Sequence, residues 1–305
     1  METLGHRGHG AKGRDPPVTN GGRVEPEYVA ARTVLLDALQ ALSAHRRALV
    51  VVGAQAVYLR TGSAGLMVAP YTTDGDVALD PSLLGDDPLL EEAMFRQGFR
   101  LLERGGGAVE PGTWIGVTDV NGTRFEVPID LIVPEAFLAG GKTRGARLPV
   151  HGKRAAKRTH GLEAALVDQS RMPLSGLALG DDRCIEVAVA GVAALLVAKV
   201  IKIRDRVADE RHIHRQKDKD AGDVLRLVRS TPVADMAERL DQLRNHEVVG
   251  GVTREALQGI DALFRAPGSP GVVMAVRAVE LDIPKAQVEA QLVGYVSELQ
   301  RRLAT

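Results

Sequence analysis

The pattern of apolar residues changes near Ala190, and this change constrains the fold more than any single motif. Before it, short runs rich in β-branched residues are separated by Gly, Pro and Asn-Gly turns, a pattern typical of strands. After it, apolar residues recur at helical spacing between Pro and Gly. The sequence therefore predicts an α+β domain, a mixed α/β sheet with packed helices, over residues 25–189. A helical bundle is expected over residues 190–305 and a disordered leader over residues 1–24.

The same spacing predicts the individual elements. Strands are expected at 48–52 and 71–79. A hairpin is expected with arms at 114–119 and 123–133, because Asn121-Gly122 is the dipeptide that best tolerates the positive φ angles of a tight turn. The expected helices span 33–44, 54–60, 88–97, 190–207, 217–229, 233–245, 254–264, 271–279 and 284–303.

Charge and cysteine content limit the function classes. The 39 Lys and Arg residues balance the 39 Asp and Glu residues, so a polyanionic partner would need a local basic surface. Cys184, the single cysteine, excludes an internal disulfide and a Cys-rich zinc site, and we expect it to be buried at the start of a strand. The longest apolar stretch, residues 187–198, is too short to cross a bilayer, so we predict a cytoplasmic protein with no membrane partner.

Two aspartates, Asp74 and Asp76, lie two apart in the expected strand 71–79, and the strand period of two places both carboxylates on one face. Hard cations such as Mg²⁺ prefer oxygen ligands of this kind, and metal-assisted phosphoryl transfer uses them. Asp130 is a candidate third carboxylate, because an acid among apolar strand residues is costly without a partner or a metal. A solvated acidic turn is the alternative interpretation of Asp74-Gly75-Asp76.

The expected strand 48–52 runs into Gly53-Ala54 and then into a helix. Backbone N–H groups at a helix N-terminus bind phosphate, and small residues there let a triphosphate approach. An ordinary strand-to-helix turn, with Gly for flexibility, is the alternative.

These motifs occur in an order that carries a family resemblance. The series Gly53-Ala54, Tyr71-Thr72-Thr73-Asp74-Gly75-Asp76, Asp130, Lys199 and Lys219-Asp220-Ala221-Gly222-Asp223-Val224 resembles the AbiEii-type nucleotidyltransferases of bacterial toxin–antitoxin systems, including the mycobacterial MenT-like tRNA-modifying toxins. The resemblance covers roughly residues 30–230. It implies a polymerase-β-like nucleotidyltransferase fold, a requirement for Mg²⁺ (or Mn²⁺), and nucleotide transfer from an NTP to an acceptor, the 3′ end of tRNA for MenT-like toxins.

The resemblance also implies roles for individual residues. Asp74 and Asp76 would bind metal with Asp130, Lys199 would contact the triphosphate, and Asp220 would complete the catalytic set. Nucleotide binding is assigned to Gly53, Ala54, Thr72, Thr73, Lys199 and Lys202.

The sequence departs from the family pattern at three places. Gly53-Ala54 replaces Gly-Gly or Gly-Ser, Pro70 replaces a basic residue, and Gly75 replaces an apolar one. Arg60, on the preceding helix, is the expected substitute for the missing basic contact.

Lys199 shares a helix face with Leu195, Leu196 and Ile203, so its side chain points toward the core or a cleft and needs an anionic partner. A triphosphate would serve, and pairing with Asp220 is the alternative. Asp220 and Asp223 are expected to share a face of the next helix.

The segment of residues 136–162, hereafter the basic segment, contains no Asp or Glu. Its cations predict a nucleic-acid surface whose affinity falls with salt, and we assign RNA binding to Lys153, Arg154, Lys157 and Arg158. The alternative is a solvated basic loop compensated by acids elsewhere.

The leading hypothesis is a metal-dependent nucleotidyltransferase toxin that transfers a nucleotide from an NTP to tRNA or another RNA and has a cognate antitoxin. A second hypothesis keeps this chemistry with a small-molecule or protein hydroxyl as acceptor. A third is a catalytically silent nucleotidyltransferase fold that acts as a binding module.

Overall fold

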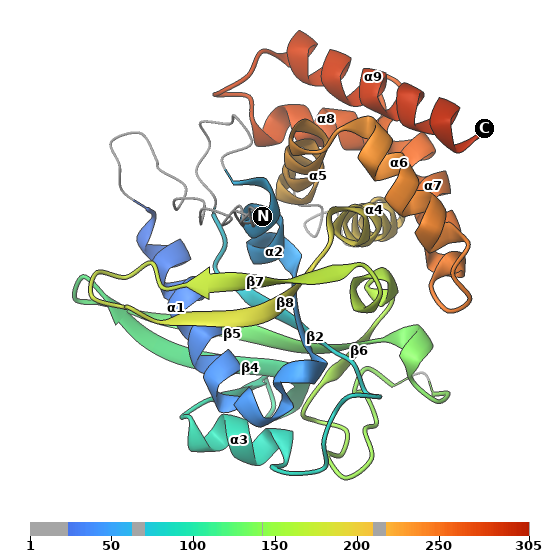
Figure 1. The fold of residues 1–305 in the computed structure, drawn as a ribbon. Helices are drawn as coiled ribbons and strands as arrows, with labels where there is room; N and C mark the ends of the chain where they lie inside the picture. Colours follow the sequence, from blue (N-terminus) through green and yellow to red (C-terminus); the bar gives the residue numbers. More distant parts are fainter. Residues whose placement is uncertain (1–23, 63–70, 142, 210–217, 305) are drawn as a thin grey trace, which may run out of the picture.

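The computed structural model describes residues 24–62, 71–141, 143–209 and 218–304 (Figure 1). The predicted leader, apart from its last residue, and Pro70 lie outside the described residues.

One mixed sheet organises the first half of the described chain, which confirms the predicted fold class. Its strand order is β3-β4-β5-β2-β1-β8-β7, and β6 pairs with β5. The strands are β1 Leu49–Val52, β2 Gly75–Leu79, β3 Arg100–Glu103, β4 Val109–Val120, β5 Thr123–Pro134, β6 Lys157–Thr159, β7 Gln169–Ser175 and β8 Cys184–Ala190. Strands β2 and β5 run parallel at the centre of the sheet, and β1 runs antiparallel to β2.

Helices cover the sheet, and every described helix or strand after β8 is a helix. Figure 1 shows α4 to α9 grouped on one side of the sheet, with α1 and α3 on the other. The helices are α1 Pro26–Ala41, α2 Gly53–Thr61, α3 Leu90–Arg96, α4 Val192–Ala208, α5 Asp218–Ser230, α6 Val233–Arg244, α7 Gly250–Phe264, α8 Pro270–Ala278 and α9 Lys285–Leu303, with short 3₁₀ turns η1 Ser43–Ala48, η2 Glu135–Phe137 and η3 Glu163–Leu166. The domain boundary at residue 190 stays a prediction.

The predicted hairpin turn is present between β4 and β5. Asn121 and Gly122 have φ angles of 52° and 78°, which are the left-handed values that a two-residue hairpin loop requires. The turn fixes the register of the two long strands, so that Thr113 lies opposite Asp130.

Some sequence expectations were wrong. Strand β2 begins at Gly75 rather than at residue 71, so Asp74 precedes the strand instead of belonging to it. Gly75 is buried, and a Cβ there would lie 2.7 Å from Ile129 Cδ1, so the space of the apolar side chain that the family pattern favours is already filled. Cys184 does start a strand, but it is exposed.

The two halves of the chain are joined at the start of α4. The Asp168 carboxylate accepts a hydrogen bond from the Ala194 N–H at 3.0 Å and thereby satisfies one free amide of this helix. In the described part of the chain, no helix has both the length and the apolar character needed to cross a membrane.

The packing of α1 on β4 leaves no room at Gly116, where a Cβ would lie 2.4 Å from Val34 Cγ1 and 2.6 Å from the Phe99 ring. We predict that Gly116→Ala lowers the free energy of unfolding by about 1–3 kcal/mol because buried side chains must shift. Gly294→Ala is the control, since nothing lies within 4 Å of a Cβ there, and it should stabilise exposed α9 by roughly 0.5–1 kcal/mol. Urea unfolding measures both, and equal effects at the two sites would contradict this packing.

Candidate active site

The sheet register brings two of the predicted carboxylates together. Asp76 of β2 is the register partner of Asp130 on β5 and of Val52 on β1. Partners in neighbouring strands point to the same face of a sheet, so the two carboxylates lie side by side. Asp74, just before β2, lines the same cavity of about 770 Å³, which lies between the sheet and helices α4 and α5.

Gly53 places the start of α2 against the Asp76 carboxylate. Its φ angle is +69°, and a Cβ on Gly53 would lie 2.0 Å from Asp76 Oδ2. Any side chain at this position would therefore occupy the space of the carboxylate and strain the backbone. Gly53 and Ala54 both line the cavity, as the phosphate-binding prediction requires, and their binding role stays a prediction.

The surroundings of Asp76 disfavour its ionised form. Burial raises the pKa of Asp76 to about 7, and the charges of Asp74 and Asp130 contribute to the rise, while Lys202 and Lys157 oppose it. A cation in the cavity would relieve this repulsion.

Two of the three carboxylates, those of Asp74 and Asp130, already accept hydrogen bonds from threonine side chains. Thr113 Oγ1 donates to Asp130 Oδ1 at 2.7 Å, and the Lys157 ammonium pairs with Asp130 Oδ2. The buried Thr72 hydroxyl donates to Asp74 Oδ1, and exposed Thr73 lines the cavity beside it.

These contacts decide which residues suit a metal ion. In the part of the chain that the structure describes, no three Asp, Glu, His or Cys side chains are arranged around one metal position. Asp130 has both oxygens engaged, whereas the Asp76 carboxylate has no hydrogen-bond partner among the described residues. One or two carboxylates are sufficient for Mg²⁺ that also binds phosphate oxygens and water, so Asp74 and Asp76 fit this ion without Asp130.

The opposite wall of the cavity is built around a buried ion cluster. The Lys199 ammonium donates to Asp220 at 2.8 Å and to Asp223 at 2.6 Å. Burial would lower the pKa of Lys199, but Asp223 and Asp220 raise it well above its ordinary value. The alternative that Lys199 pairs with Asp220 is therefore the arrangement seen in the structure.

Asp220 is the centre of this cluster rather than a free carboxylate. It also pairs with Arg206 at 2.5 Å and with Lys202 at 3.2 Å. Burial opposes ionisation, yet Lys199, Lys202 and Arg206 hold the pKa of Asp220 well below its usual range. Lys202 has an exposed fraction of 45% and can reach solvent in the cavity, unlike Lys199.

The basic segment is compensated by acids from other elements. Lys157 pairs with Asp130, Arg158 pairs with Glu135 at 3.2 Å, and Arg154 pairs with Glu91 at 2.5 Å. Lys153 is exposed and has no ion pair among the described residues. The structure thus places Lys157 and Arg158 at the cavity and leaves Lys153 and Arg154 outside it.

The expectation that Arg60 replaces a phosphate contact was wrong. Its guanidinium donates to the carbonyl oxygens of Ala190 at 2.9 Å and Val189 at 2.5 Å, and to Ser170 Oγ at 2.9 Å. Arg60 therefore ties α2 to strands β7 and β8 and does not line the cavity.

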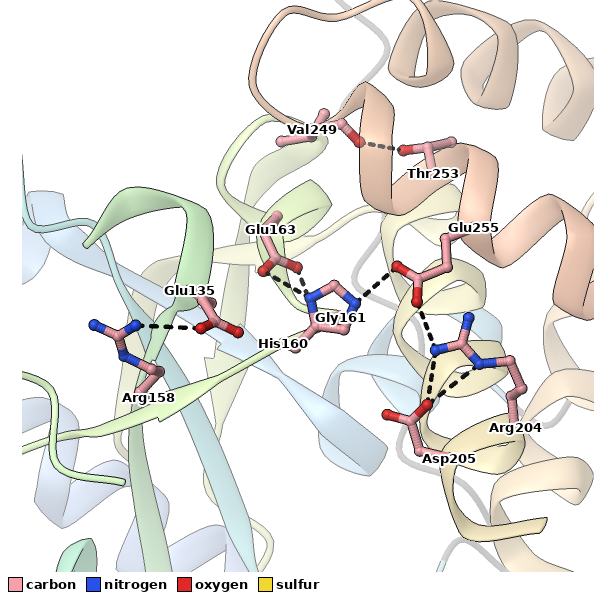
Figure 2. A network of polar contacts seen from close by, with 10 residues as sticks. All are labelled: Glu135, Arg158, His160, Gly161, Glu163, Arg204, Asp205, Val249, Thr253 and Glu255. Carbon is pink, nitrogen blue, oxygen red and sulfur yellow. Dashed lines mark hydrogen bonds and ion pairs between the residues drawn. The ribbon is translucent and has the colours of Figure 1, made fainter. Parts of the chain in front are cut away.

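His160, a residue of the basic segment whose partners the sequence did not indicate, joins the two halves of the chain at the cavity (Figure 2). Its Nε2 lies 2.8 Å from Glu255 of α7, and its Nδ1 lies 3.6 Å from buried Glu163. Glu255 also pairs with Arg204 of α4 at 2.6 Å. The contact with the Glu163 carboxylate raises the pKa of His160 to about 9 against the effect of burial, and Glu255 adds to the rise.

Comparison with known proteins adds little. No family model matches the chain, and no curated protein matches it. A solved structure of an antigenic nucleotidyltransferase-like protein from Paracoccidioides brasiliensis is similar at a TM-score of 0.34 and 14% sequence identity, over 94% of each chain. The geometry of the cavity is therefore the main guide to function.

The His160 bridge predicts a pH dependence of stability. Because the folded-state pKa of His160 is raised to about 9, its contribution is complete below the unfolded value of about 6.5. It is lost as pH rises through 9. The melting temperature of His160→Gln should thus lie furthest below that of the wild type at pH 6 and approach it at pH 10.

His246→Gln is the control, because the His246 ring accepts a hydrogen bond from Val248 of its own loop and takes part in no ion pair within the described ranges. A wild-type to His160→Gln difference that stays constant from pH 6 to pH 10 would contradict the bridge.

Proposed function

We propose that this protein transfers a nucleotide from a nucleoside triphosphate to a hydroxyl acceptor with the help of Mg²⁺ or Mn²⁺. The observation that carries the proposal is the position of Asp76. Its carboxylate lies between the start of α2 at Gly53 and the neighbouring Asp130, in a cavity with cationic side chains on the opposite wall. Carboxylates can hold the metal ion of a metal-bound triphosphate, and a helix N-terminus and cationic side chains can bind its phosphate groups.

The reaction is an in-line displacement at phosphorus. The acceptor oxygen forms a bond to the α-phosphorus, the bond from this phosphorus to the α–β bridging oxygen breaks, and pyrophosphate leaves with that electron pair. The hydroxyl proton passes to solvent. A divalent ion held by Asp74 and Asp76 would neutralise phosphate charge and increase the reactivity of the phosphorus.

The chain's own residues divide the remaining roles. Gly53 and Ala54 line the cavity at the start of α2, where their amides would bind phosphate oxygens. Thr72 orients the Asp74 carboxylate, and Thr113 orients Asp130. Lys157 neutralises Asp130 and Lys202 extends toward the cavity, so each supplies positive charge beside the carboxylates.

RNA is our first candidate acceptor, on the basis of the family resemblance, which would make the protein a toxin neutralised by an antitoxin. The exposed cations Arg147 and Lys153 of the basic segment would contact its phosphates. A small-molecule or protein hydroxyl is the second candidate, because Arg154, Lys157 and Arg158 are already paired with acids.

The metal assignment predicts that Asp76→Asn lowers the transfer rate by at least about 100-fold, because several kcal/mol of charge stabilisation at phosphorus are removed. Folding should not suffer, since the substitution removes a charge that burial disfavours. Label transfer from each labelled NTP to total tRNA measures activity, and thermal unfolding measures stability.

Asp119→Asn, at an exposed position of β4, is the matched control and should keep full activity. An active Asp76→Asn variant would remove the site assignment. Absence of transfer by the wild type to any acceptor would favour a silent binding fold.

The RNA proposal predicts a salt effect. Replacing Arg147 and Lys153 together by Ala should weaken tRNA binding. The slope of log K against log[salt] should become shallower by roughly 0.7 for each single-strand phosphate that the variant no longer neutralises. Arg265→Ala/Lys285→Ala, at exposed positions of the helical half, is the control. A slope that does not change in the first variant would favour a small acceptor.

A further inference from the structure

The cations that line the cavity are almost all held by acids. These ion pairs are Arg144 with Glu110, Lys157 with Asp130, Arg158 with Glu135, His160 with Glu163 and Glu255, Lys199 with Asp220 and Asp223, Lys202 with Asp220, and Arg206 with Asp220. A cation engaged in this way must give up a partner before it binds a phosphate.

Lys219 is the exception among the described residues that line the cavity. It lies in the first turn of α5 and is partly buried. Its ammonium takes part in no ion pair or hydrogen bond with any described residue. Burial lowers the pKa of Lys219, while the charges of Asp74, Asp223 and Asp220 partly restore it.

The acids nearest to Lys219 on α5 are paired with other cations and compensate its charge only in part. Asp218 pairs with Arg277 at 2.7 Å, and Asp220 and Asp223 are held by Lys199. The start of a helix is also the positive end of its dipole, which disfavours a cation there. A partly buried ammonium in this position is unfavourable for the empty protein and becomes favourable when an anion enters the cavity.

We propose that Lys219 binds the phosphate chain of the triphosphate, across the cavity from Asp74 and Asp76. This inference rests on the proposed function, since it names the residue that contacts the donor substrate. Lys199 then has a structural role, because its ion pairs with Asp220 and Asp223 connect α4 to the first two turns of α5 and so hold Lys219 at the cavity wall.

The test is the binding of inorganic tripolyphosphate in the presence of Mg²⁺, measured by calorimetry on the full chain. Tripolyphosphate has no base or sugar, so the result does not depend on which NTP is used. We expect Lys219→Ala to weaken binding about 10- to 100-fold, the effect of removing one charge-assisted hydrogen bond. Lys219→Arg should retain most of the affinity. Lys285→Ala, on exposed α9, is the control and should bind like the wild type.

A structural role for Lys219 gives a different result. If Lys219 only stabilised α5, Lys219→Ala would lower the melting temperature of the ligand-free protein. We expect an equal or higher melting temperature without ligand and a smaller increase on adding tripolyphosphate.

Three outcomes separate the inference from the proposed function. Equal binding by the wild type and Lys219→Ala overturns the inference alone. Weak binding by Lys219→Ala, with no nucleotide transfer by the wild type to any acceptor, supports the inference and overturns the transferase activity. A wild type that binds no tripolyphosphate overturns both.

Discussion

The position of partly buried Asp76 beside two other carboxylates is the constraint on which the charges around the cavity depend. The register of β1, β2 and β5 fixes its position, and Gly53 admits its carboxylate because it has no side chain. Neighbouring carboxylates in a partly desolvated site disfavour ionisation, so the protein needs positive charge nearby. Lys157 and Lys202 supply some of it from opposite walls. A divalent ion would supply the remainder.

The helical half contributes an ion cluster rather than isolated side chains. Asp220 contacts three cations, and Lys199 is shared by two aspartates, so removing the buried Lys199 or the buried Asp220 leaves a buried charge without its main partner. Removing one buried partner of such a cluster is strongly destabilising. Because Lys199 lies on α4 and both aspartates lie on α5, the cluster therefore holds these two helices together. Substrate contact is therefore better served by Lys202 at the edge of the cluster or by Lys219 outside it. A buried lysine next to an active-site motif is thus not by itself evidence of substrate contact.

Local sequence signals were sufficient to predict much of this architecture. The features that were not predicted depend on contacts between residues that are far apart in the sequence. Asn121-Gly122 predicted the hairpin, and counting outward from that turn would also have placed Thr113 opposite Asp130. The edge strand β7 carries Pro173 and exposed polar residues, so its alternation is too weak to predict a strand. The assignment of Asp74 to a strand failed because β2 gains its partner β5 only from Gly75 onward. The contact of His160 with Glu255 could not have been predicted, because Glu255 is distant in sequence and comes close only when α7 packs on α4.

The basic segment shows why a run of one charge sign does not define a binding surface. Its sequence contains no acid, yet Glu91 of α3, Glu110 of β4 and Asp130 of β5 each pair with one of its cations. These pairs hold a segment with little regular structure against the sheet, and they direct Lys157 toward the carboxylates rather than toward solvent. An RNA acceptor would then depend on the few exposed cations that remain, and its affinity would be modest and sensitive to salt.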